Sequence, residues 1–343
     1  MSFIRNTNEL YHHGFIQEQD IEEIKKVEQV FSVSLTPQMV DLVAKENAEG
    51  PLTKQFIPQP QELMILDNEL SDPIGDNAHN VQEGIIHRYP DRCLLMPVNV
   101  CPVYCRFCFR REKVGSNSKK LSSEALKKAI NYIADHPEIW EVIITGGDPL
   151  ILNPKQLANI ILSLNKIQHL EVIRIHTRIP IVDSKRITDE MLNALKVDKA
   201  LYIALHANHP SELTPQAVEA CAKIVDAGIP MLSQTVLLKG INNNIETLSQ
   251  LMRAFVKNRI KPYYIHHPDL ARGTSHFRVS IQEGQALIKA LRGRYSGLCQ
   301  PTYVLEIPGG YGKIPINDHF ITPKGKGYCM EDYQGRYHEY ADQ

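Results

Sequence analysis

The segments EVIITGG, residues 141–147, and NPKQLANIILSLN, residues 153–165, show the pattern from which the fold is predicted. The first is a short, almost entirely apolar run, which is typical of a β-strand buried on both faces of a sheet. The second places its apolar residues at helical spacing, which indicates an amphipathic α-helix. Together they form one strand–helix unit.

The same unit recurs along the chain after residue 92. We expect strands at 92–100, 141–147, 171–177, 200–206, 230–238, 261–267 and 302–308, and helices at 122–135, 153–165, 188–196, 214–228, 244–258 and 280–293. Apolar strands that alternate with helices predict a parallel sheet of the α/β class, covered by helices. Six or seven units favour a full or partial barrel over an open doubly wound sheet. We expect a partial parallel βα barrel of about six units.

The rest of the chain divides around this core. Residues 1–85 contain two segments with helical signals, QDIEEIKKVEQVFSV and TPQMVDLVAKEN, followed by the polar, turn-rich stretch NELSDPIGDNAHN. We therefore expect an N-terminal helical region and linker in 1–85, the barrel core in 86–316 and a C-terminal tail in 317–343.

Composition excludes several classes of partner. The 343 residues carry a net charge of −1 and no basic block, so nothing indicates a nucleic-acid ligand. No apolar run approaches the roughly 20 residues of a membrane span. The opening MSFIRNTNELYHH lacks the apolar core of a signal peptide. We expect a soluble cytoplasmic protein.

Polar side chains gather where the predicted strands end. In a parallel βα barrel the loops after the strand carboxyl ends form the active site. In chain order these ends carry the segment NVCPVYC, the turn GGDP (146–149), His176, Arg178, His206, His209, Gln234, His266, His267, Asp269, Glu306 and the segment PGGYGK (308–313). A structural protein has little reason to place such residues at one rim, so we expect a catalytic or binding site there.

Three of the seven cysteines lie within eight residues, at Cys101, Cys105 and Cys108. An odd count and a tight cluster do not suit a secreted disulfide framework. Thiolates suit zinc or iron–sulfur clusters, but structural zinc usually takes four ligands in two pairs, and no second pair follows. An iron–sulfur cube usually takes four thiolates, so three leave one iron open to a small molecule. The alternatives are a zinc ion completed by a distant histidine, or three incidental cysteines.

The turn PGGYGK presents Lys313 next to several glycines, which permit close backbone approach. A lysine presented in this way can form a Schiff base with pyridoxal phosphate (PLP). In isolation, an ordinary surface lysine after a turn is the simpler interpretation.

The spacing Cys–x3–Cys–x2–Cys, with Phe107 before the last cysteine, resembles the signature of the radical S-adenosylmethionine (SAM) superfamily. The resemblance implies a [4Fe–4S] cluster on Cys101, Cys105 and Cys108, whose open iron binds SAM and generates a 5′-deoxyadenosyl radical. The GGDP turn resembles the Gly-Gly-Glu-type motif of the superfamily, whose backbone meets the SAM amino group. It implicates Gly146, Gly147 and Asp148 in cofactor binding.

The cysteine loop, the segment YPDRCLL (89–95) and the turn PGGYGK together are similar to the lysine 2,3-aminomutase family, over residues 87–316. The resemblance implies an isomerase that converts L-lysine to β-lysine with the [4Fe–4S] cluster, SAM and PLP. By the resemblance, the residue roles are Lys313 for PLP, Tyr89 and Arg92 for its phosphate, His206 and Gln234 for SAM, Arg110 for the substrate carboxylate, and Asp269 and Glu306 for the far ammonium group.

The chain departs from the larger members of that family in two respects. Glu306 stands where they have Asp, and the chain lacks their Cys-rich zinc-binding tail, with Asn244 at the position of a further zinc cysteine. This short zinc-free form is similar to the bacterial type that makes (R)-β-lysine for modification of elongation factor P (EF-P). The implied partners are free L-lysine, a low-potential electron donor of the flavodoxin or ferredoxin type, and a functional link to the EF-P modification enzymes.

Three alternative functions stay open from the sequence. The first is the same chemistry on glutamate or arginine, and two retained acids argue against glutamate. The second is a radical SAM enzyme without PLP, such as a methyltransferase or a maturase. The third is a non-catalytic zinc or iron–sulfur binding module. Without the family resemblance, Asp269 reads as a turn cap and Glu306 as a solvated strand residue.

Overall fold

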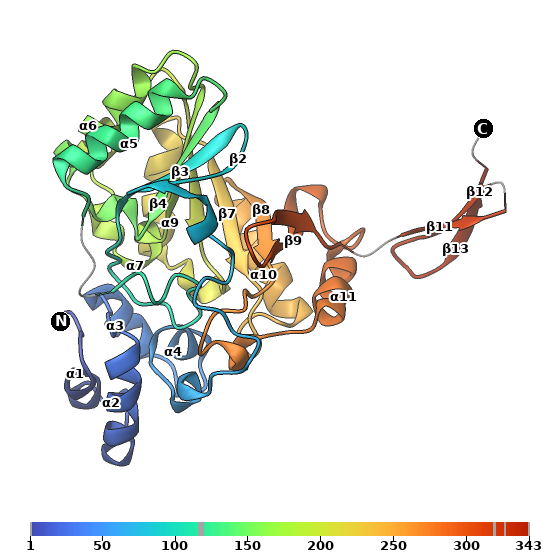
Figure 1. Cartoon of the computed structure of the whole chain (residues 1–343). Helices are drawn as coiled ribbons and strands as arrows, with labels where there is room; N and C mark the ends of the chain where they lie inside the picture. The colour runs from blue at the N-terminus through green and yellow to red at the C-terminus, as the bar shows by residue number, and fades with distance from the viewer. Residues whose placement is uncertain (1, 116–119, 318–319, 326, 342–343) are drawn as a thin grey trace.

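A ten-stranded sheet whose strands lie in chain order forms the centre of the structure (Figure 1). The structure is a computed structural model and describes residues 2–115, 120–317, 320–325 and 327–341. The strands are β1 (Asn80–Gln82), β2 (Ile85–Tyr89), β3 (Arg92–Val98), β4 (Glu141–Gly146), β5 (Val172–Thr177), β6 (Ala200–His206), β7 (Met231–Val236), β8 (Ile260–His266), β9 (Thr302–Ile307) and β10 (Gly312–Pro315). Strands β3 to β9 pair in parallel, whereas β1, β2 and β10 pair antiparallel.

The predicted parallel βα barrel is confirmed, and it is partial. Six parallel pairings run without interruption from β3 to β9. Within the described residues β1 and β10 are the two edges of the sheet, so the barrel does not close. Strand β4 shows why the strands could be predicted from the sequence. It lies between two parallel neighbours and has four consecutive buried residues, Val142, Ile143, Ile144 and Thr145, so it reads as an apolar run.

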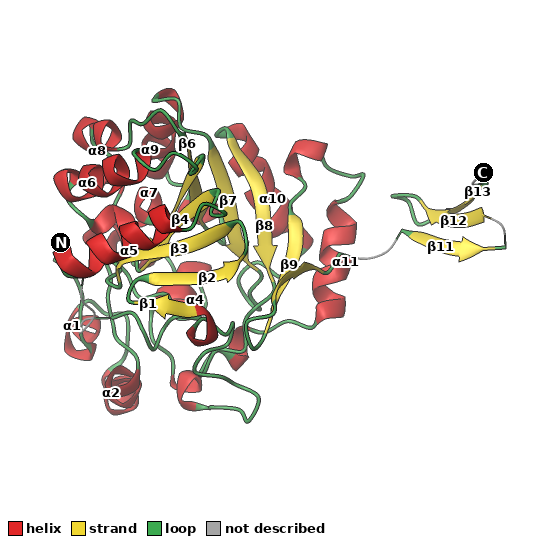
Figure 2. Ribbon diagram, turned by 45° about the horizontal axis from the view of Figure 1, so that its top comes forward, coloured by secondary structure: helices red, strands yellow, loops and turns green. Residues whose placement is uncertain are grey.

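Helices cover the outer face of the curved sheet (Figure 2). They are α5 (Ser123–Asp135), α6 (Pro154–Asn165), α7 (Ile179–Val182), α8 (Asp189–Ala194), α9 (Pro215–Asp226), α10 (Ile245–Lys257) and α11 (Ile281–Leu291). Ser, Thr or Asn caps the N-terminus of each of these except α7, and its side chain accepts a hydrogen bond from a first-turn N–H. Asn244 is one of these caps and accepts from the N–H of Thr247 at 2.8 Å, immediately before the first residue of α10.

The N-terminal helices pack against the barrel. They are α1 (Thr7–His12), α2 (Ile21–Val30), α3 (Pro37–Val43) and α4 (Pro51–Phe56). Thr36 caps α3 and accepts from the N–H of Met39, as the Thr-Pro signal suggested. Buried side chains of this region, such as Leu10 and Phe56, belong to the same hydrophobic core as those of β4. The division at residue 85 stays a prediction; it coincides with the first residue of β2.

The C-terminal segment forms a second, small antiparallel sheet that projects from the barrel beside α11 (Figure 1). Its strands are β11 (Ile321–Lys324), β12 (Gly327–Glu331) and β13 (Tyr337–Tyr340). Lys289 of α11 forms an ion pair with Glu331 at 2.6 Å. Part of the predicted tail, residues 318–319, 326 and 342–343, lies outside the described residues. None of the described helices could cross a membrane by length and apolar content.

Candidate active site

A cavity of about 700 Å³ opens where the parallel strands end, and every residue to which the family resemblance gives a role lines it, whereas His209 and His267, two of the predicted strand-end residues, do not. The residues with such a role are Tyr89, Arg92, Cys101, Cys105, Cys108, Arg110, Gly146, Gly147, Asp148, His206, Gln234, Asp269, Glu306 and Lys313. They come from eight strands or the loops that follow them. Parallel strands bring their carboxyl ends to the same rim, while Tyr89 and Lys313 reach the cavity from the antiparallel strands β2 and β10, and Arg92 from the first residue of β3. The structure therefore brings the predicted residues together, while the role of each stays a prediction.

The Gly-Gly turn at the end of β4 is hydrogen-bonded to the backbone that leads into the cysteine loop. The N–H of Gly147 donates to the carbonyl of Val98 at 2.7 Å, and the N–H of Asp148 donates to that of Val100 at 3.0 Å. A Cβ on Gly147 would lie 2.2 Å from the carbonyl oxygen of Val100, and Gly146 adopts a φ of +104°. Both positions need glycine, since any side chain would push the loop away or strain the backbone.

Asp148 ties the ends of β4 and β5 together. Its carboxylate accepts from the hydroxyl of Thr177 and from the N–H of Arg178, both at 2.7 Å, and from the N–H of Leu150 at 3.1 Å. Burial raises the pKa of this carboxyl, although the hydrogen bonds oppose the shift. If Asp148 takes part in SAM binding, as predicted, it does so while its carboxylate accepts these three hydrogen bonds.

The three thiols suit an iron–sulfur cluster. None of them forms a disulfide, and all are partly accessible from the cavity. Burial and the neighbouring thiols raise the pKa of Cys108 to about 11 and that of Cys101 well above its usual value, so both thiols hold their protons at neutral pH and would lose them on binding a metal. Within the described part of the chain, no three His, Cys, Asp or Glu side chains lie close enough to hold a single metal ion. Three thiols that are free of disulfides and line one cavity fit the three protein ligands expected of an iron–sulfur cluster with an open iron.

Lys313 is the second residue of β10, directly after the glycine turn at whose end the sequence places it. Gly309, Gly310 and Gly312 have φ values of +91°, +87° and +94°, and they fold the chain back so that β10 pairs with β9. In this register Lys313 is directly opposite Glu306, and its Nζ lies 2.9 Å from Glu306 Oε1.

The predicted phosphate-binding residues lie beside this lysine. The hydroxyl of Tyr89 accepts a hydrogen bond from the backbone N–H of Lys313 at 2.8 Å. The guanidinium of Arg92 lies over the Tyr89 ring, 3.8 Å from its centroid, and pairs with Asp91 at 2.6 Å. Lys313, Tyr89 and Arg92 therefore form one contiguous wall of the cavity.

A chain of alternating charges crosses the cavity wall, and sequence reasoning missed two of its members. Glu306 Oε2 lies 3.2 Å from Arg88, Arg88 lies 3.0 Å from Asp76, and Asp76 lies 2.9 Å from Arg110. Asp76 is in the stretch that the sequence indicated was a polar linker, and Arg88 immediately precedes Tyr89. Both oxygens of Glu306 are thus paired, one with Lys313 and one with Arg88.

Asp269 and three histidines complete the wall. Burial, and then the charge of Glu306, raise the pKa of Asp269 to about 7. Burial lowers the pKa of His206 to about 3 and those of His176 and His266 well below the usual value, so all three imidazoles are neutral at physiological pH. Gln234 neighbours His206 in the paired strands β6 and β7.

The residues present also fit PLP. The cavity is large enough for a cofactor-sized ligand, and Lys313, Tyr89 and Arg92 line it together. The Nε2 atoms of His176 and His266 are buried in the cavity wall and have no hydrogen-bond partner among the described residues. Buried polar atoms normally have a partner, so these two indicate that the cavity is built around a polar ligand.

The chain matches the radical SAM superfamily over residues 95–252. It is 37% identical to an L-lysine 2,3-aminomutase of Fusobacterium nucleatum, over 93% of this chain and 75% of the relative. It is 36% identical to an L-lysine 2,3-aminomutase of Clostridium subterminale, over 99% and 82%. It is also 38% identical to a glutamate 2,3-aminomutase of Clostridioides difficile, over 90% and 73%.

These identities extend over most of the chain and over more than two thirds of each relative. They agree with the cysteine loop, the Gly-Gly turn and the lysine-bearing hairpin, which all face one cavity at the mouth of the partial barrel. Such agreement between sequence, fold and site is expected of an isomerase of this kind. The chain belongs to the radical SAM superfamily and, within it, to the lysine 2,3-aminomutase family.

Proposed function

We propose that the protein is an L-lysine 2,3-aminomutase, which moves the 2-amino group of L-lysine to C3 and yields β-lysine. The observation that carries the proposal is the single cavity that holds the cysteine loop, Lys313 and an acidic residue, Asp269, together. A radical SAM enzyme without PLP has no need of a lysine at this position, and a non-catalytic metal module has no need of the cavity.

Family membership implies a [4Fe–4S] cluster and SAM, and the aminomutase relatives depend on PLP. In this chain Cys101, Cys105 and Cys108 would hold the cluster, and Lys313 would hold PLP. When bound, the cluster and SAM supply the radical that abstracts hydrogen from the substrate, and PLP carries the migrating amino group. The protein's own residues bind and orient the substrate and exclude water from it.

Two charged ends of the cavity would fix the substrate. The guanidinium of Arg110 uses Nε and Nη2 to bind Asp76, at 3.2 and 2.9 Å, which holds the side chain in place for a carboxylate at its remaining edge. Asp269 would bind the far ammonium group of lysine as an ionised carboxylate. Glu306 contributes less than the sequence suggested, since Arg88 and Lys313 already share its charge.

Lysine is favoured over glutamate by the same charges. One relative is a glutamate 2,3-aminomutase at similar identity, so overall similarity does not choose the substrate. A substrate with a side-chain carboxylate would place a second negative charge beside Asp269 and Glu306, which repel it. A cationic side chain instead lowers the pKa of Asp269 and binds to its charged form.

The decisive experiment is a substrate panel. The protein is reconstituted anaerobically with iron, sulfide and PLP, then incubated with SAM, dithionite and L-lysine, L-glutamate or L-arginine. Chromatography with mass spectrometry measures each β-isomer, and we expect β-lysine to form at least about tenfold faster than the others, as expected for one desolvated ion pair. Predominant β-glutamate would establish the glutamate alternative, and 5′-deoxyadenosine without any β-amino acid would establish chemistry without PLP.

Lys313→Ala tests the cofactor assignment. The variant keeps its three cysteines, so its iron and sulfide content should equal that of the wild type. Because no other predicted residue can hold PLP covalently, borohydride treatment should leave PLP attached to the wild type and not to the variant. Peptide mass spectrometry locates the label, and PLP attached to a different lysine would contradict the assignment.

The destination of the product and the source of the electron are further parts of the proposal. We place the reaction in the cytoplasm, with a flavodoxin or ferredoxin as the electron donor and with EF-P modification as the use of β-lysine. The resemblance to the bacterial type that makes β-lysine for EF-P supports the link. Deletion of the gene should leave EF-P without β-lysine, as measured by mass spectrometry of purified EF-P, and unchanged modification would refute the link.

A further inference from the structure

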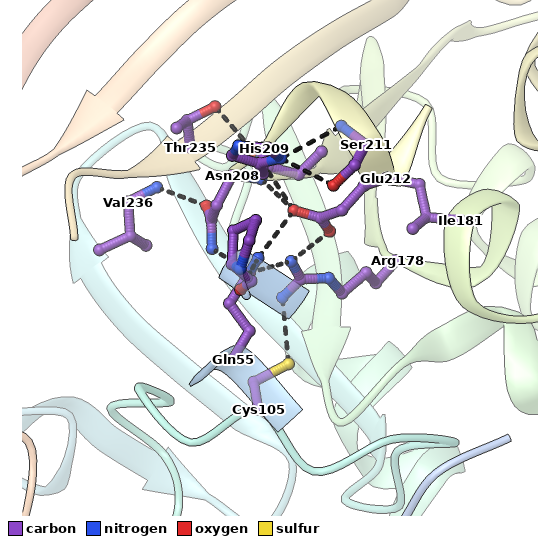
Figure 3. A network of polar contacts seen from close by, with 12 residues as sticks. Gln55, Cys105, Arg178, Ile181, Asn208, His209, Ser211, Glu212, Thr235 and Val236 are labelled. Atoms are coloured by element: carbon purple, nitrogen blue, oxygen red, sulfur yellow. Dashed lines mark hydrogen bonds and ion pairs between the residues drawn. The ribbon is translucent and has the colours of Figure 1, made fainter. Parts of the chain in front are cut away.

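Arg178 places a positive charge against one of the three cysteines (Figure 3). Its Nη1 lies 3.1 Å from the sulfur of Cys105 and donates a hydrogen bond to it. Arg178 follows β5 and lines the cavity, and from the sequence it is only a polar residue at a strand end. The family resemblance gave it no role.

The guanidinium is fixed from several sides. Its Nη2 donates to Glu212 Oε2 at 2.6 Å and to Gln55 Oε1 at 2.9 Å, and its backbone N–H donates to Asp148. The aromatic rings of Phe56 and Phe107 flank it, with centroids 5.1 and 5.4 Å from the central carbon of the guanidinium. An arginine held in this way cannot turn its Nη1 away from the sulfur without losing several contacts.

Glu212 is itself fixed by backbone groups. It is fully buried, and its Oε1 accepts from the N–H groups of Asn208 and His209 at 2.7 and 2.9 Å, at the start of the short 3-10 helix Pro210–Glu212. Gln55 accepts a further hydrogen bond from the side chain of Asn208. The support of Arg178 therefore comes from the end of β5, the loop after β6 and α4, whose side chains meet on one side of Cys105 (Figure 3).

The Nη1 group of Arg178, which donates to Cys105, is suited to a negatively charged sulfur. Glu212 balances the charge of Arg178, so stability alone does not require a third acceptor at Nη1. A neutral thiol is a weak acceptor, whereas a thiolate accepts a charge-assisted hydrogen bond. The arrangement is thus matched to Cys105 in its metal-bound form, and the fit of the three cysteines to a cluster is described above.

We propose that Arg178 is a positioning residue that hydrogen-bonds the cluster-ligating sulfur of Cys105 and raises the reduction potential of the [4Fe–4S] cluster. One electron from an external low-potential reductant converts the 2+ cluster to the 1+ state, and no proton is transferred. The reduced cluster carries one more negative charge, so a fixed cationic donor at a ligand sulfur stabilises it more than the oxidised cluster. The inference rests on the cluster assigned to these cysteines and not on the identity of the amino-acid substrate.

Arg178→Met tests the effect on the potential. The reconstituted variant is titrated anaerobically with dithionite, and EPR measures the fraction of reduced cluster. We expect the equilibrium constant for reduction to fall by roughly tenfold, which corresponds to about 59 mV for one electron. Arg178→Lys keeps the charge but cannot reach Glu212 and the sulfur together, so its potential should lie between those of the wild type and Arg178→Met.

Arg186→Met is the matched control. Arg186 lies in the next segment of chain and donates to the backbone carbonyls of Leu150 and Ile151, at 3.0 and 2.8 Å, without touching a thiol. Its removal should leave the potential unchanged. A potential of Arg178→Met equal to that of the wild type, at equal iron and sulfide content, would overturn the proposal.

A measurement on the wild type decides the matter even if the variants assemble no cluster. Protein that contains ¹⁵N-labelled arginine is reduced, and pulsed EPR is used to search for a magnetic coupling between the cluster and an arginine nitrogen. A coupling is expected for a direct hydrogen bond to a ligand sulfur, and its absence would refute the contact. Neither experiment requires turnover of lysine, so a failure of the proposed substrate would leave this result standing.

Discussion

Asp269 lies in the cavity wall, where burial and the nearby charge of Glu306 raise its pKa to about 7. In the ligand-free protein the carboxyl is therefore largely protonated below pH 7 and ionised above it. A cationic side chain is bound by the ionised form. The pH at which this one carboxyl loses its proton should therefore control how well the enzyme binds lysine.

We predict that the KM for L-lysine decreases as the pH rises from about 6 to 8, following the ionisation of Asp269. Asp269→Asn should raise the KM by roughly ten- to a hundredfold, the value of one hydrogen bond to a charged group, and should remove this part of the pH dependence. Initial rates at several pH values provide the measurement, after correction for the ionisation of free lysine itself.

The control for this substitution is the cluster. Iron content and SAM binding of Asp269→Asn should match the wild type, because Asp269 contacts neither the cysteine loop nor the Gly-Gly turn by any described hydrogen bond or ion pair. A parallel loss of cluster and of lysine turnover would show that Asp269 has a structural role. The folded state raises the pKa of Asp269 from its ordinary value of 3.8 to about 7, so it binds this proton more tightly than the unfolded chain does. The ligand-free protein should therefore lose stability as the pH rises from about 4 to about 7.

The junction between β4 and the cysteine loop is the contact between elements on which the site depends most directly. Gly147→Ala would place a methyl group 2.2 Å from the carbonyl oxygen of Val100 and 2.7 Å from its nitrogen, both backbone atoms. Because backbone atoms cannot rotate aside, the loop that carries the cysteines must shift, at a cost of roughly 1–3 kcal/mol. We predict a lower iron and sulfide content and a weaker affinity for SAM, measured by metal analysis and by calorimetry.

Gly297→Ala is the matched substitution for this prediction. A Cβ at Gly297 meets no atom within 4 Å, and the residue does not adopt a positive φ. This variant should keep the metal content and SAM affinity of the wild type. If Gly147→Ala behaves in the same way, the close approach of the two elements does not matter for the site.

For the molecule as a whole, the sequence predicts what depends on local pattern. The strands and helices of the barrel were predictable because apolar runs such as 141–146 alternate with capped amphipathic segments. Their order then placed the strand-end residues at one rim, since parallel strands share their direction. The site could be assembled from the sequence for the same reason, without any knowledge of distances.

What the sequence does not predict depends on contacts between distant segments. Asp76 and Arg88 belong to the charge chain because Arg88 meets Glu306, 218 positions away, and no local pattern encodes that pairing. The strand position of Lys313 follows from the positive φ values of Gly309, Gly310 and Gly312 around one turn, which a glycine-rich segment allows but does not require. Arg178 gains its contact with Cys105 only when β5 and the cysteine loop meet.

The N-terminal region contacts the cysteine loop through backbone hydrogen bonds, such as that from the N–H of Arg106 to the carbonyl of Gln55 at 2.8 Å, and through one buried carboxylate, which provides a test of the architecture. Glu62 is fully buried and binds Arg106 at 2.6 Å, and it also contacts Arg111. Burial opposes its ionised form, but the two arginines outweigh burial and lower the pKa of Glu62. The ion pairs therefore stabilise the fold above the ordinary pKa of 4.5, and that stabilisation is lost as the pH falls through the lower folded-state value.

We predict that Glu62→Gln destabilises the protein by about 3–5 kcal/mol at pH 7, because it leaves two buried arginines without their counter-charge. Guanidinium unfolding followed by circular dichroism provides the measurement, and the difference from the wild type should shrink as the pH falls below the folded-state pKa of Glu62. Glu219→Gln, which breaks an exposed pair with Lys223, should change stability by less than about 0.5 kcal/mol. Equal effects of the two substitutions would mean that the Glu62 ion pairs do not hold the cysteine loop, which would then be held by its other contacts, such as the backbone hydrogen bonds from Tyr104 to Ser34 and from Arg106 to Gln55.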